Sequence, residues 1–186
     1  MRKGIHISGF LIPLVYVQFL SLYFVTIGLF LVILVYTLSE VARNYGLNFP
    51  VFSTVTRKAA KSFFEVKYFA TAPIAFTLGI TISLLFFPSS IAYTSITVLT
   101  LGDGFANIFG KAFGKTPLPF NGKKTLEGTI CGFVCAFLGS ILFVNPLKAL
   151  VAVTVGMLAE TLPLQIDDNL VIPLSAGLAL IIISSL

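Results

Sequence analysis

Residues 7–38 read ISGFLIPLVYVQFLSLYFVTIGLFLVILVYTL and contain no charged side chain. A transmembrane helix needs about 20 apolar residues, within a range of about 17–25. The run is therefore too long for one ordinary span and just long enough for two short ones. A break near the polar Gln18 and Ser21 predicts spans at roughly 5–20 and 22–40. This stretch places the chain among integral membrane proteins.

The rest of the chain has the same apolar character. Of its 186 residues, 57% are hydrophobic and 10% are charged, and the mean hydropathy is +1.02, whereas soluble domains carry about 25% charged residues. We therefore expect an all-α fold, a polytopic membrane helical bundle with about seven transmembrane helices, in which residues 1–186 form a single integral membrane domain. The remaining apolar runs lie at roughly 69–87, 91–109, 126–144, 147–162 and 170–186.

Basic side chains fall unevenly on the two sides that seven spans create. Only Lys148 of the twelve Lys and Arg residues lies on one side, and the other eleven share the opposite side. Because cytoplasmic loops carry the excess of Lys and Arg, the N-terminus is predicted to be cytoplasmic. The acids lie near the same face, which indicates a polar site open to the cytoplasm, although loop solvation is the simpler explanation for any single acid. The eleven cations are Arg2, Lys3, Arg43, Arg57, Lys58, Lys61, Lys67, Lys111, Lys115, Lys123 and Lys124, and the acids are Glu40, Glu65, Asp103, Glu127, Glu160, Asp167 and Asp168.

Charge and glycine come together in residues 102–129, GDGFANIFGKAFGKTPLPFNGKKTLEGT. Asp103 follows only about 11 apolar residues, roughly 16 Å of helix, so its carboxylate is expected below the membrane surface, facing a cavity, a partner charge or a metal. Asn107, Gly110 and Gly114 fall on or near the same helical face. Asp103 and Asn107 could supply oxygen ligands to Mg²⁺, and the glycines could admit a phosphate. Alternatively, Gly110 and Gly114 form a helix-packing motif.

The second half of this stretch contains a candidate anion site. Lys123 and Lys124 immediately precede Thr125, which is a good N-cap for the next helix. The free N–H groups and the dipole of a helix start add to the ammonium charges, so a polyphosphate is the natural ligand. Glu127 in the first turn could bind the Mg²⁺ of that phosphate. The alternative is that both lysines contact lipid head groups.

Two other glycine-linked lysines, Lys111 and Lys115, are expected to support phosphate binding. They do not form a Walker A motif, because Gly110 and Gly114 stand one residue too close for it and no strand precedes them. Phosphate binding would therefore have to be built from helix ends and side chains.

Polar residues near the ends of two other spans complete the candidate set. Asp167, Asp168 and Asn169 adjoin the last span and suit a metal site, although helix N-caps have the same composition. His6 lies at the edge of the first span, and it is either an interfacial packing residue or a proton acceptor, since the side chain of histidine commonly accepts protons near neutral pH.

Four motifs in combination resemble the dolichol kinase and phytol kinase family, which includes CTP-dependent diacylglycerol kinases. Phosphatidate cytidylyltransferase is similar in a narrower way, through an Asp…Gly…Gly-Lys run and a K-K-T-x-E-G box. In place of its signature Ser-Pro, this chain has Asn121-Gly122. The four motifs are Arg2-Lys3-x-x-His6, GDGFANIFGKAFGK at 102–115, LPFNGKKTLEGT at 118–129, and E-x-L-P-x-x-x-DDNLVIPL at 160–174.

The resemblance implies a CTP-dependent kinase that phosphorylates the hydroxyl of a membrane isoprenoid alcohol, of the dolichol, polyprenol or geranylgeraniol type, and releases CDP. Phosphoryl transfer requires mainly positioning and charge neutralisation. We expect Lys123, Lys124 and Thr125 to bind the nucleotide with support from Lys111, Lys115, Gly110, Gly114 and Asn107. Mg²⁺ is assigned to Asp103, Glu127 and Asp167, and the catalytic set is Asp103, Asp168, Asp167 and His6.

Three rival functions stay open from the sequence. They are a CTP:phosphatidate cytidylyltransferase-like enzyme, a CTP-dependent diacylglycerol kinase, and a transporter, since intramembrane charge also marks ion paths. The expected partners are CTP, a lipid alcohol and membrane lipids, with no nucleic acid. The sequence leaves the host membrane and the oligomeric state open.

Overall fold

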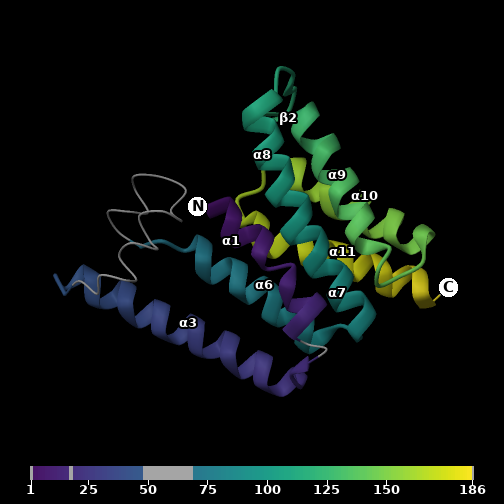
Figure 1. Ribbon diagram of the computed structural model, residues 1–186. Coiled ribbons are helices and arrows are strands. Elements are labelled where there is room, and N and C mark those ends of the chain that lie inside the picture. Colours follow the sequence, from purple (N-terminus) through teal and green to yellow (C-terminus); the bar gives the residue numbers. More distant parts are fainter. Residues whose placement is uncertain (1, 17–18, 48–68, 186) are drawn as a thin grey trace.

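The computed structural model describes residues 2–16, 19–47 and 69–185, and within them it is mostly helical (Figure 1). The basic residues Arg57, Lys58, Lys61 and Lys67, together with Glu65, lie outside the described residues. In chain order the elements are α1 (Arg2–Ser8), the π-helical turn η1 (Ile12–Tyr16), α3 (Leu22–Asn44), α6 (Ala72–Phe86), α7 (Ser89–Thr97), the π-helical turn η2 (Val98–Asp103), α8 (Gly104–Phe113), β1 (Pro117–Leu118), β2 (Asn121–Thr125), α9 (Leu126–Ser140), α10 (Pro146–Thr161) and α11 (Asp168–Ser185).

Helical segments occur at each of the predicted spans, but most are shorter than a bilayer requires. Two described helices are long and apolar enough to cross a membrane, Leu22–Asn44 and Asp168–Ser185. Three shorter apolar helices cover His6–Val15, Ala72–Phe86 and Leu126–Ser140. The structure therefore confirms a mostly helical fold and is consistent with membrane association. The number of spans and the cytoplasmic N-terminus stay predictions.

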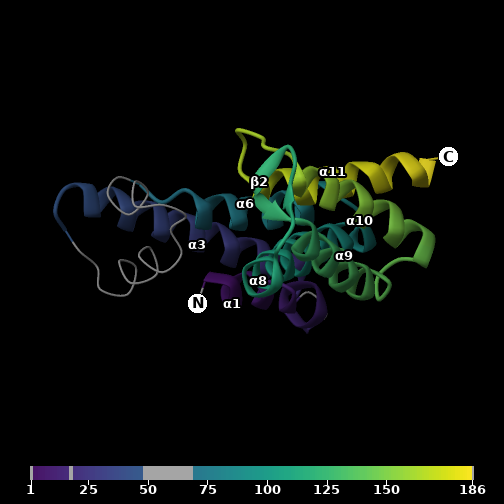
Figure 2. The same cartoon turned by 90° about the horizontal axis from the view of Figure 1, so that it is seen from above.

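The helices form one bundle, with α3 along its outer side (Figures 1 and 2). Helix α10 packs against α11, α8 packs against α9, and α6 lies between α11 and α3. The core between them is apolar and close-packed, because each helix turns its branched and small residues inward. Its largest fully buried apolar side chains include Ile80, Ile96, Leu99, Met157, Ile172 and Leu180.

Glycines allow α9 to approach η2 and α8 at backbone distance. A Cβ atom on Gly132 would lie 2.5 Å from the Gly102 carbonyl oxygen and 2.7 Å from Ala106 Cβ. A Cβ on Gly128 would lie 2.5 Å from the Ala106 carbonyl oxygen and 2.8 Å from Gly110 Cα. Small residues permit this kind of close helix contact. The packing interpretation of Gly110 is therefore confirmed, and this contact brings the start of α9 close to α8.

A short antiparallel hairpin, β1–β2, joins α8 to α9, so the prediction of a wholly α-helical fold missed one small sheet. The loop before it is held by Glu127 in the first turn of α9. The Glu127 carboxylate accepts hydrogen bonds from the backbone N–H groups of Lys115 and Thr116, at 3.1 Å each, and from the Thr116 hydroxyl at 2.9 Å. The hairpin residue Asn121 donates from Nδ2 to the Thr161 carbonyl oxygen at 3.0 Å, which ties the hairpin to α10.

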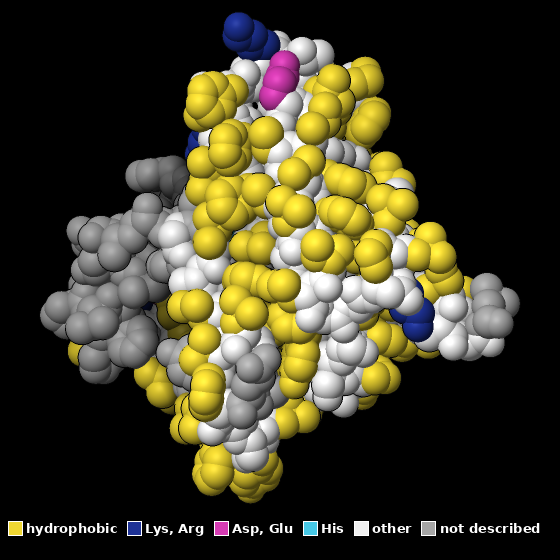
Figure 3. Space-filling view, turned by 45° about the vertical axis from the view of Figure 1, so that its right-hand side comes forward, with side chains coloured by type: hydrophobic (Ala, Val, Ile, Leu, Met, Phe, Trp, Pro, Cys, Tyr) yellow, Lys and Arg dark blue, Asp and Glu magenta, His cyan; other side chains and the backbone are white. Residues whose placement is uncertain are grey.

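The surface of the molecule is strongly apolar. Figure 3 shows hydrophobic side chains spread over the middle of one face, with Lys or Arg and Asp or Glu side chains at the upper end, where Figure 1 places the hairpin, and another Lys or Arg side chain at the right. On α3, Phe24, Phe30 and Leu38 are more than half exposed. Many exposed apolar side chains on one face are typical of a surface that contacts lipid or a partner.

The close contact between α9 and α8 predicts that Gly132→Ala destabilises the protein by about 1–3 kcal/mol, because the new methyl group meets backbone and Cβ atoms that cannot move aside. Gly28→Ala in α3 is the matched control, since a Cβ there meets nothing within 4 Å and alanine favours a helix. The measurement is thermal unfolding in detergent. Equal melting temperatures for the two variants would contradict the packing argument.

Candidate functional site

Asp103 is the last residue of η2, where the continuous helical run from α7 into α8 is locally widened into a π-turn. Such π-segments occur frequently at functional sites. Gly102 and Gly104 flank it and leave the backbone open to close neighbours, namely Met157 and Ile7. Asp103 is 5% exposed, so its carboxylate is buried within the protein, and its depth relative to a membrane stays a prediction.

Three side chains surround the Asp103 carboxylate. Asn107, one turn later on α8, donates from Nδ2 to Asp103 Oδ1 at 2.6 Å. His6 Nδ1 lies 3.1 Å from Asp103 Oδ2, without the geometry of a hydrogen bond. The His6 ring stacks on Phe76 with the centroids 4.3 Å apart, and Lys124 Nζ lies 3.9 Å from Asp103 Oδ1. The structure thus brings together four residues that the sequence assigned to the site, and Asn107 faces the carboxylate with its nitrogen.

The Lys124 ammonium is the centre of a larger acidic cluster. It pairs with Glu160 Oε1, and its Nζ lies 3.2 Å from Asp168 Oδ2. The three carboxylates come from η2, α10 and α11, while the lysine comes from β2. Burial by itself would lower the pKa of Lys124, but the charges of Glu160, Asp103 and Asp168 outweigh it and raise this pKa above its usual value of 10.5. Lys124 is therefore fully charged at neutral pH.

Glu160 is a site residue that the sequence reasoning did not assign. It lies in the last turn of α10 and is 1% exposed. Its Oε1 pairs with Lys124, whereas its Oε2 is buried and has no hydrogen-bond donor among the residues that the structure describes. An ionisable residue at the end of an apolar run is a general signal of function, and Glu160 is the only one between 149 and 166.

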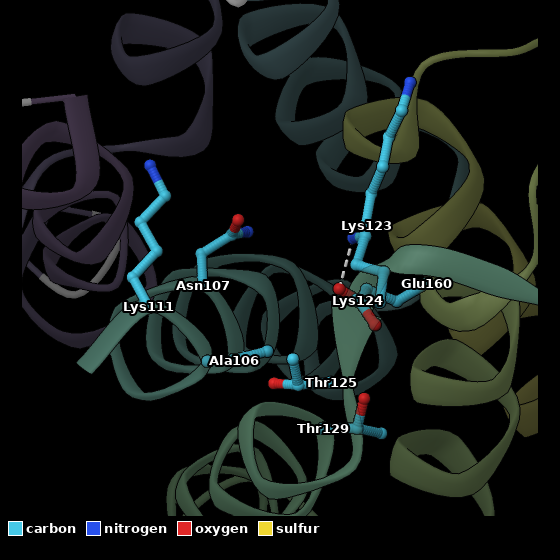
Figure 4. Close-up of a pocket in the computed structure, with 9 residues that line it drawn as sticks. Ala106, Asn107, Lys111, Lys123, Lys124, Thr125, Thr129 and Glu160 are labelled. Atoms are coloured by element: carbon cyan, nitrogen blue, oxygen red, sulfur yellow. Dashed lines mark hydrogen bonds and ion pairs between the residues drawn. The ribbon is translucent and has the colours of Figure 1, made fainter. Parts of the chain in front are cut away.

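A pocket opens beside this cluster, between α8 and the strand β2 (Figure 4). Lys111 and Asn107 rise from α8 on one side, and Lys123 extends from β2 on the other. The cavity measures about 80 Å³, and a buried water needs about 10–15 Å³ on this measure, so it has room for a phosphate-sized group. The polar side chains that line it are Asn107, Lys111, Lys123, Lys124, Thr125, Thr129 and Glu160.

Thr125 connects this pocket to the helix start. Its hydroxyl accepts a hydrogen bond from the Gly128 N–H at 3.3 Å, which confirms it as the N-cap of α9. Lys123 and Lys124 lie in β2, just before that cap, and their side chains diverge (Figure 4). Lys123 is exposed and available to a ligand, whereas Lys124 is directed to the acids.

Other predicted site residues lie apart from the acidic cluster. The Glu127 carboxylate is turned to the loop after α8, next to the exposed Lys115. Asp167 accepts a hydrogen bond from the Asn169 N–H at 3.0 Å, which is the helix-capping alternative for this segment. Gly114 adjoins Thr125, where a Cβ would meet Oγ1 at 2.5 Å. These residues support the loops around the pocket.

Carboxylate oxygens are the ligands that Mg²⁺ prefers, and Asp103, Glu160 and Asp168 provide them at one place. As the described residues are arranged, no three His, Cys, Asp or Glu side chains form a group that could hold a metal. The cation among these carboxylates is the Lys124 ammonium. The three carboxylates have the right chemistry for Mg²⁺, and the Lys124 ammonium lies where such an ion would bind.

We predict that Lys124→Met lowers the free energy of unfolding by about 3–5 kcal/mol, since it leaves buried carboxylates without their counter-ion. Lys123→Met is the matched control and should change stability little, because Lys123 is exposed. Unfolding in detergent measures both variants. A raised lysine pKa contributes stability that is complete below pH 10.5 and is lost as the pH rises through the folded value. The difference in the free energy of unfolding between wild type and Lys124→Met should therefore be constant from pH 7 to 10 and decrease above pH 10. If Lys124→Met lost no more stability than Lys123→Met, the stabilising role of the Lys124 ion pairs would be contradicted.

Comparison with known proteins gives one family. The model of the family described as "Cytidylyltransferase family" matches residues 2–184, nearly the whole chain. No solved structure matches the chain.

Curated relatives carry kinase names. The chain is 32% identical over 126 residues to "Phytol kinase 1, chloroplastic" of Arabidopsis thaliana, and 34% identical over 125 residues to "Farnesol kinase, chloroplastic" of the same plant. Each match covers 58% of this chain and 41% of the relative. "Probable phytol kinase, chloroplastic" of Triticum aestivum is 28% identical over 158 residues, which is 73% of this chain and 51% of the relative. The resemblance to lipid-alcohol kinases is confirmed, and the chain spans about two fifths to one half of the length of these relatives.

Proposed function

Because this chain belongs to the cytidylyltransferase family, we propose that it is a CTP-dependent kinase that phosphorylates the hydroxyl of a membrane isoprenoid alcohol and releases CDP. The similarity to proteins named phytol kinase and farnesol kinase supports this choice of reaction. Phytol and farnesol are isoprenoid alcohols of different length, so the acceptor class is an isoprenoid alcohol rather than one chain length.

The observation that carries the proposal is the pocket with lysines on both sides and acids behind it. Lys111 from α8 and Lys123 from β2 flank a cavity of phosphate size. The Thr125 cap places the start of α9 beside it, where a helix dipole favours an anion. A triphosphate bound here would place its terminal phosphoryl group next to the acidic cluster. Phosphoryl transfer depends mainly on such positioning and charge.

We assign Mg²⁺ to the nucleotide phosphates, with Asp103 and Asp168 as its protein ligands. Both carboxylates face the same point, at present held by the Lys124 ammonium. When bound, the metal neutralises charge on the phosphates during transfer. Asn107 orients Asp103 through its 2.6 Å hydrogen bond, and His6, stacked on Phe76, places its Nδ1 3.1 Å from the other carboxylate oxygen.

We further propose that the protein spans the membrane several times, with this site at the cytoplasmic surface. The apolar middle of the molecule and the charged side chains at the hairpin end support this orientation (Figure 3). CTP would then arrive from the aqueous side, and the alcohol would arrive from the bilayer. This arrangement separates a water-soluble substrate from an insoluble one while bringing both to one pocket.

A second candidate is transfer of a cytidylyl group to a phospholipid acid, which the family's description favours. The two reactions differ in the bond that breaks. A kinase attacks the γ-phosphorus and releases CDP, whereas a cytidylyltransferase attacks the α-phosphorus and releases pyrophosphate. A diacylglycerol acceptor is the third possibility and gives CDP as well.

The test is incubation of the purified protein with CTP, ATP or UTP and a panel of acceptors: farnesol, geranylgeraniol, phytol, dolichol, diacylglycerol and phosphatidic acid. We expect CDP and a prenyl monophosphate in equal amounts, identified by mass spectrometry. Pyrophosphate with a CDP-lipid would replace the proposal by the cytidylyltransferase reaction. Diacylglycerol as the preferred acceptor would replace the isoprenoid.

Asp103→Asn should reduce phosphoryl transfer from γ-³²P-labelled CTP by at least 10²-fold, the typical effect of removing one charge-stabilising group. The protein should stay folded, because asparagine has the same shape. Lys148→Gln at the far end of α10 is the control and should keep wild-type activity, since its side chain takes no part in the cluster or pocket. Wild-type activity in Asp103→Asn would remove this residue from the mechanism.

A further inference from the structure

One acceptor at the pocket has no donor. Glu160 Oε2 is buried and receives no hydrogen bond from the described residues, although Oε1 of the same carboxylate pairs with Lys124. Leaving a buried acceptor unsatisfied is destabilising, and more so when the acceptor is charged. Glu160 is among the residues that line the pocket, so a ligand that enters beside it could bring the missing donor.

The Lys124 ammonium pairs with this carboxylate, but other anionic groups compete for it. It lies among Glu160, Asp168 and Asp103, and it also lines the pocket that we assign to the phosphates. A triphosphate entering that pocket attracts the ammonium away from Glu160. The carboxylate then loses its cation at the moment when the nucleotide is in place.

The chain next to Glu160 is suited to a lipid. The segment from α10 to α11 joins two members of the cluster, Glu160 and Asp168, and it exposes Leu162, Leu164 and Ile166 at 46%, 45% and 62%. Exposed apolar side chains of this kind favour an apolar ligand. An isoprenoid tail lying along this segment would bring its hydroxyl to the Glu160 side of the pocket.

We propose that Glu160 is the catalytic residue that accepts the proton of the lipid alcohol, and that Lys124 releases it for this role when CTP binds. This inference rests on the proposed kinase function. The alcohol oxygen forms a bond to the γ-phosphorus while the bond from that phosphorus to the β-bridging oxygen breaks. The hydroxyl proton passes to Glu160 Oε2, CDP leaves with the electron pair, and Glu160 returns the proton to solvent after product release.

His6 Nδ1 also lacks a hydrogen bond among the described residues, but it faces Asp103 and His6 is not among the residues that line the pocket. The carboxylate candidates are engaged or exposed. Asp103 is held by Asn107 and faces His6. Asp167 accepts the Asn169 N–H. The Asp168 side chain is 29% exposed, against 1% for Glu160, so water already reaches it. Among the described residues, Glu160 alone combines burial, an unpartnered oxygen and a place in the lining of the pocket.

The main test is Glu160→Gln, which preserves shape and removes proton acceptance. We expect kcat to fall by about 10²–10⁴-fold, the range for general base catalysis, while the Kd for CTP, measured by calorimetry, stays equal or becomes tighter because Lys124 is freed. A kcat within fivefold of wild type overturns the proposal. So does a Kd that weakens in proportion to the lost activity, or an altered preference for CTP over UTP, because either result assigns Glu160 to nucleotide binding.

A second test uses chemical rescue. Glu160→Ala opens space for a small carboxylate, so added formate should restore activity at least tenfold, whereas formate should not raise the activity of Lys148→Ala, the control on the same helix. Absence of rescue contradicts proton acceptance. If these variants fold poorly, Glu160→Asp decides: it keeps a carboxylate and should exceed Glu160→Gln in kcat, and the reverse order overturns the proposal. Loss of the kinase function itself would appear differently, as a wild-type protein that forms no CDP.

Discussion

The structure depends on one ammonium group placed among three carboxylates from three separate helical elements. Lys124 reaches the cluster from the hairpin strand β2, while Asp103, Glu160 and Asp168 belong to η2, α10 and α11. Charges removed from water are stable only when they are paired. The ends of these elements must therefore converge, and any arrangement that separates them leaves a buried charge alone.

The glycine contact between α8 and α9 makes this convergence possible. Gly128 and Gly132 let the α9 backbone approach η2 and α8 closely, which brings β2 over the end of α8. With larger residues the helices would separate, and the lysine would not reach Asp103. The small residues thus set the distance between α8 and α9, and the charge pairing of Lys124 with the acids depends on that distance.

The site has basic side chains on one side and acidic side chains on the other. Lysines line the pocket on the side open to solvent, and acids lie behind them beside an exposed apolar segment. A polyphosphate and a lipid hydroxyl need opposite surroundings, because one is an anion in water and the other is a small polar group on an apolar chain. In the proposed mechanism, the Lys124 ammonium moves between the acids and the nucleotide phosphates and so serves both substrates.

Local sequence patterns were enough to predict most of the helices and several residues of the site. Apolar runs predicted the helices, Thr125 was recognised as a helix cap, and the burial of Asp103 agrees with its position in an apolar run. The motifs also indicated the family, which the match over residues 2–184 confirms. The two-stranded hairpin was not predicted, because its two strands are too short to show an alternating pattern. These features depend on residues within a few helical turns of one another, so the local sequence is enough to predict them.

Only the tertiary structure revealed which charges share a site. Glu160 is 36 residues from Lys124, and no local pattern links them. Glu127, adjacent to the lysines in sequence, instead faces the backbone after α8. Ion pairing acts through space and depends on where helices end relative to one another, so the sequence by itself determined the elements and the chemical groups, and the packing of the helices decided their partners.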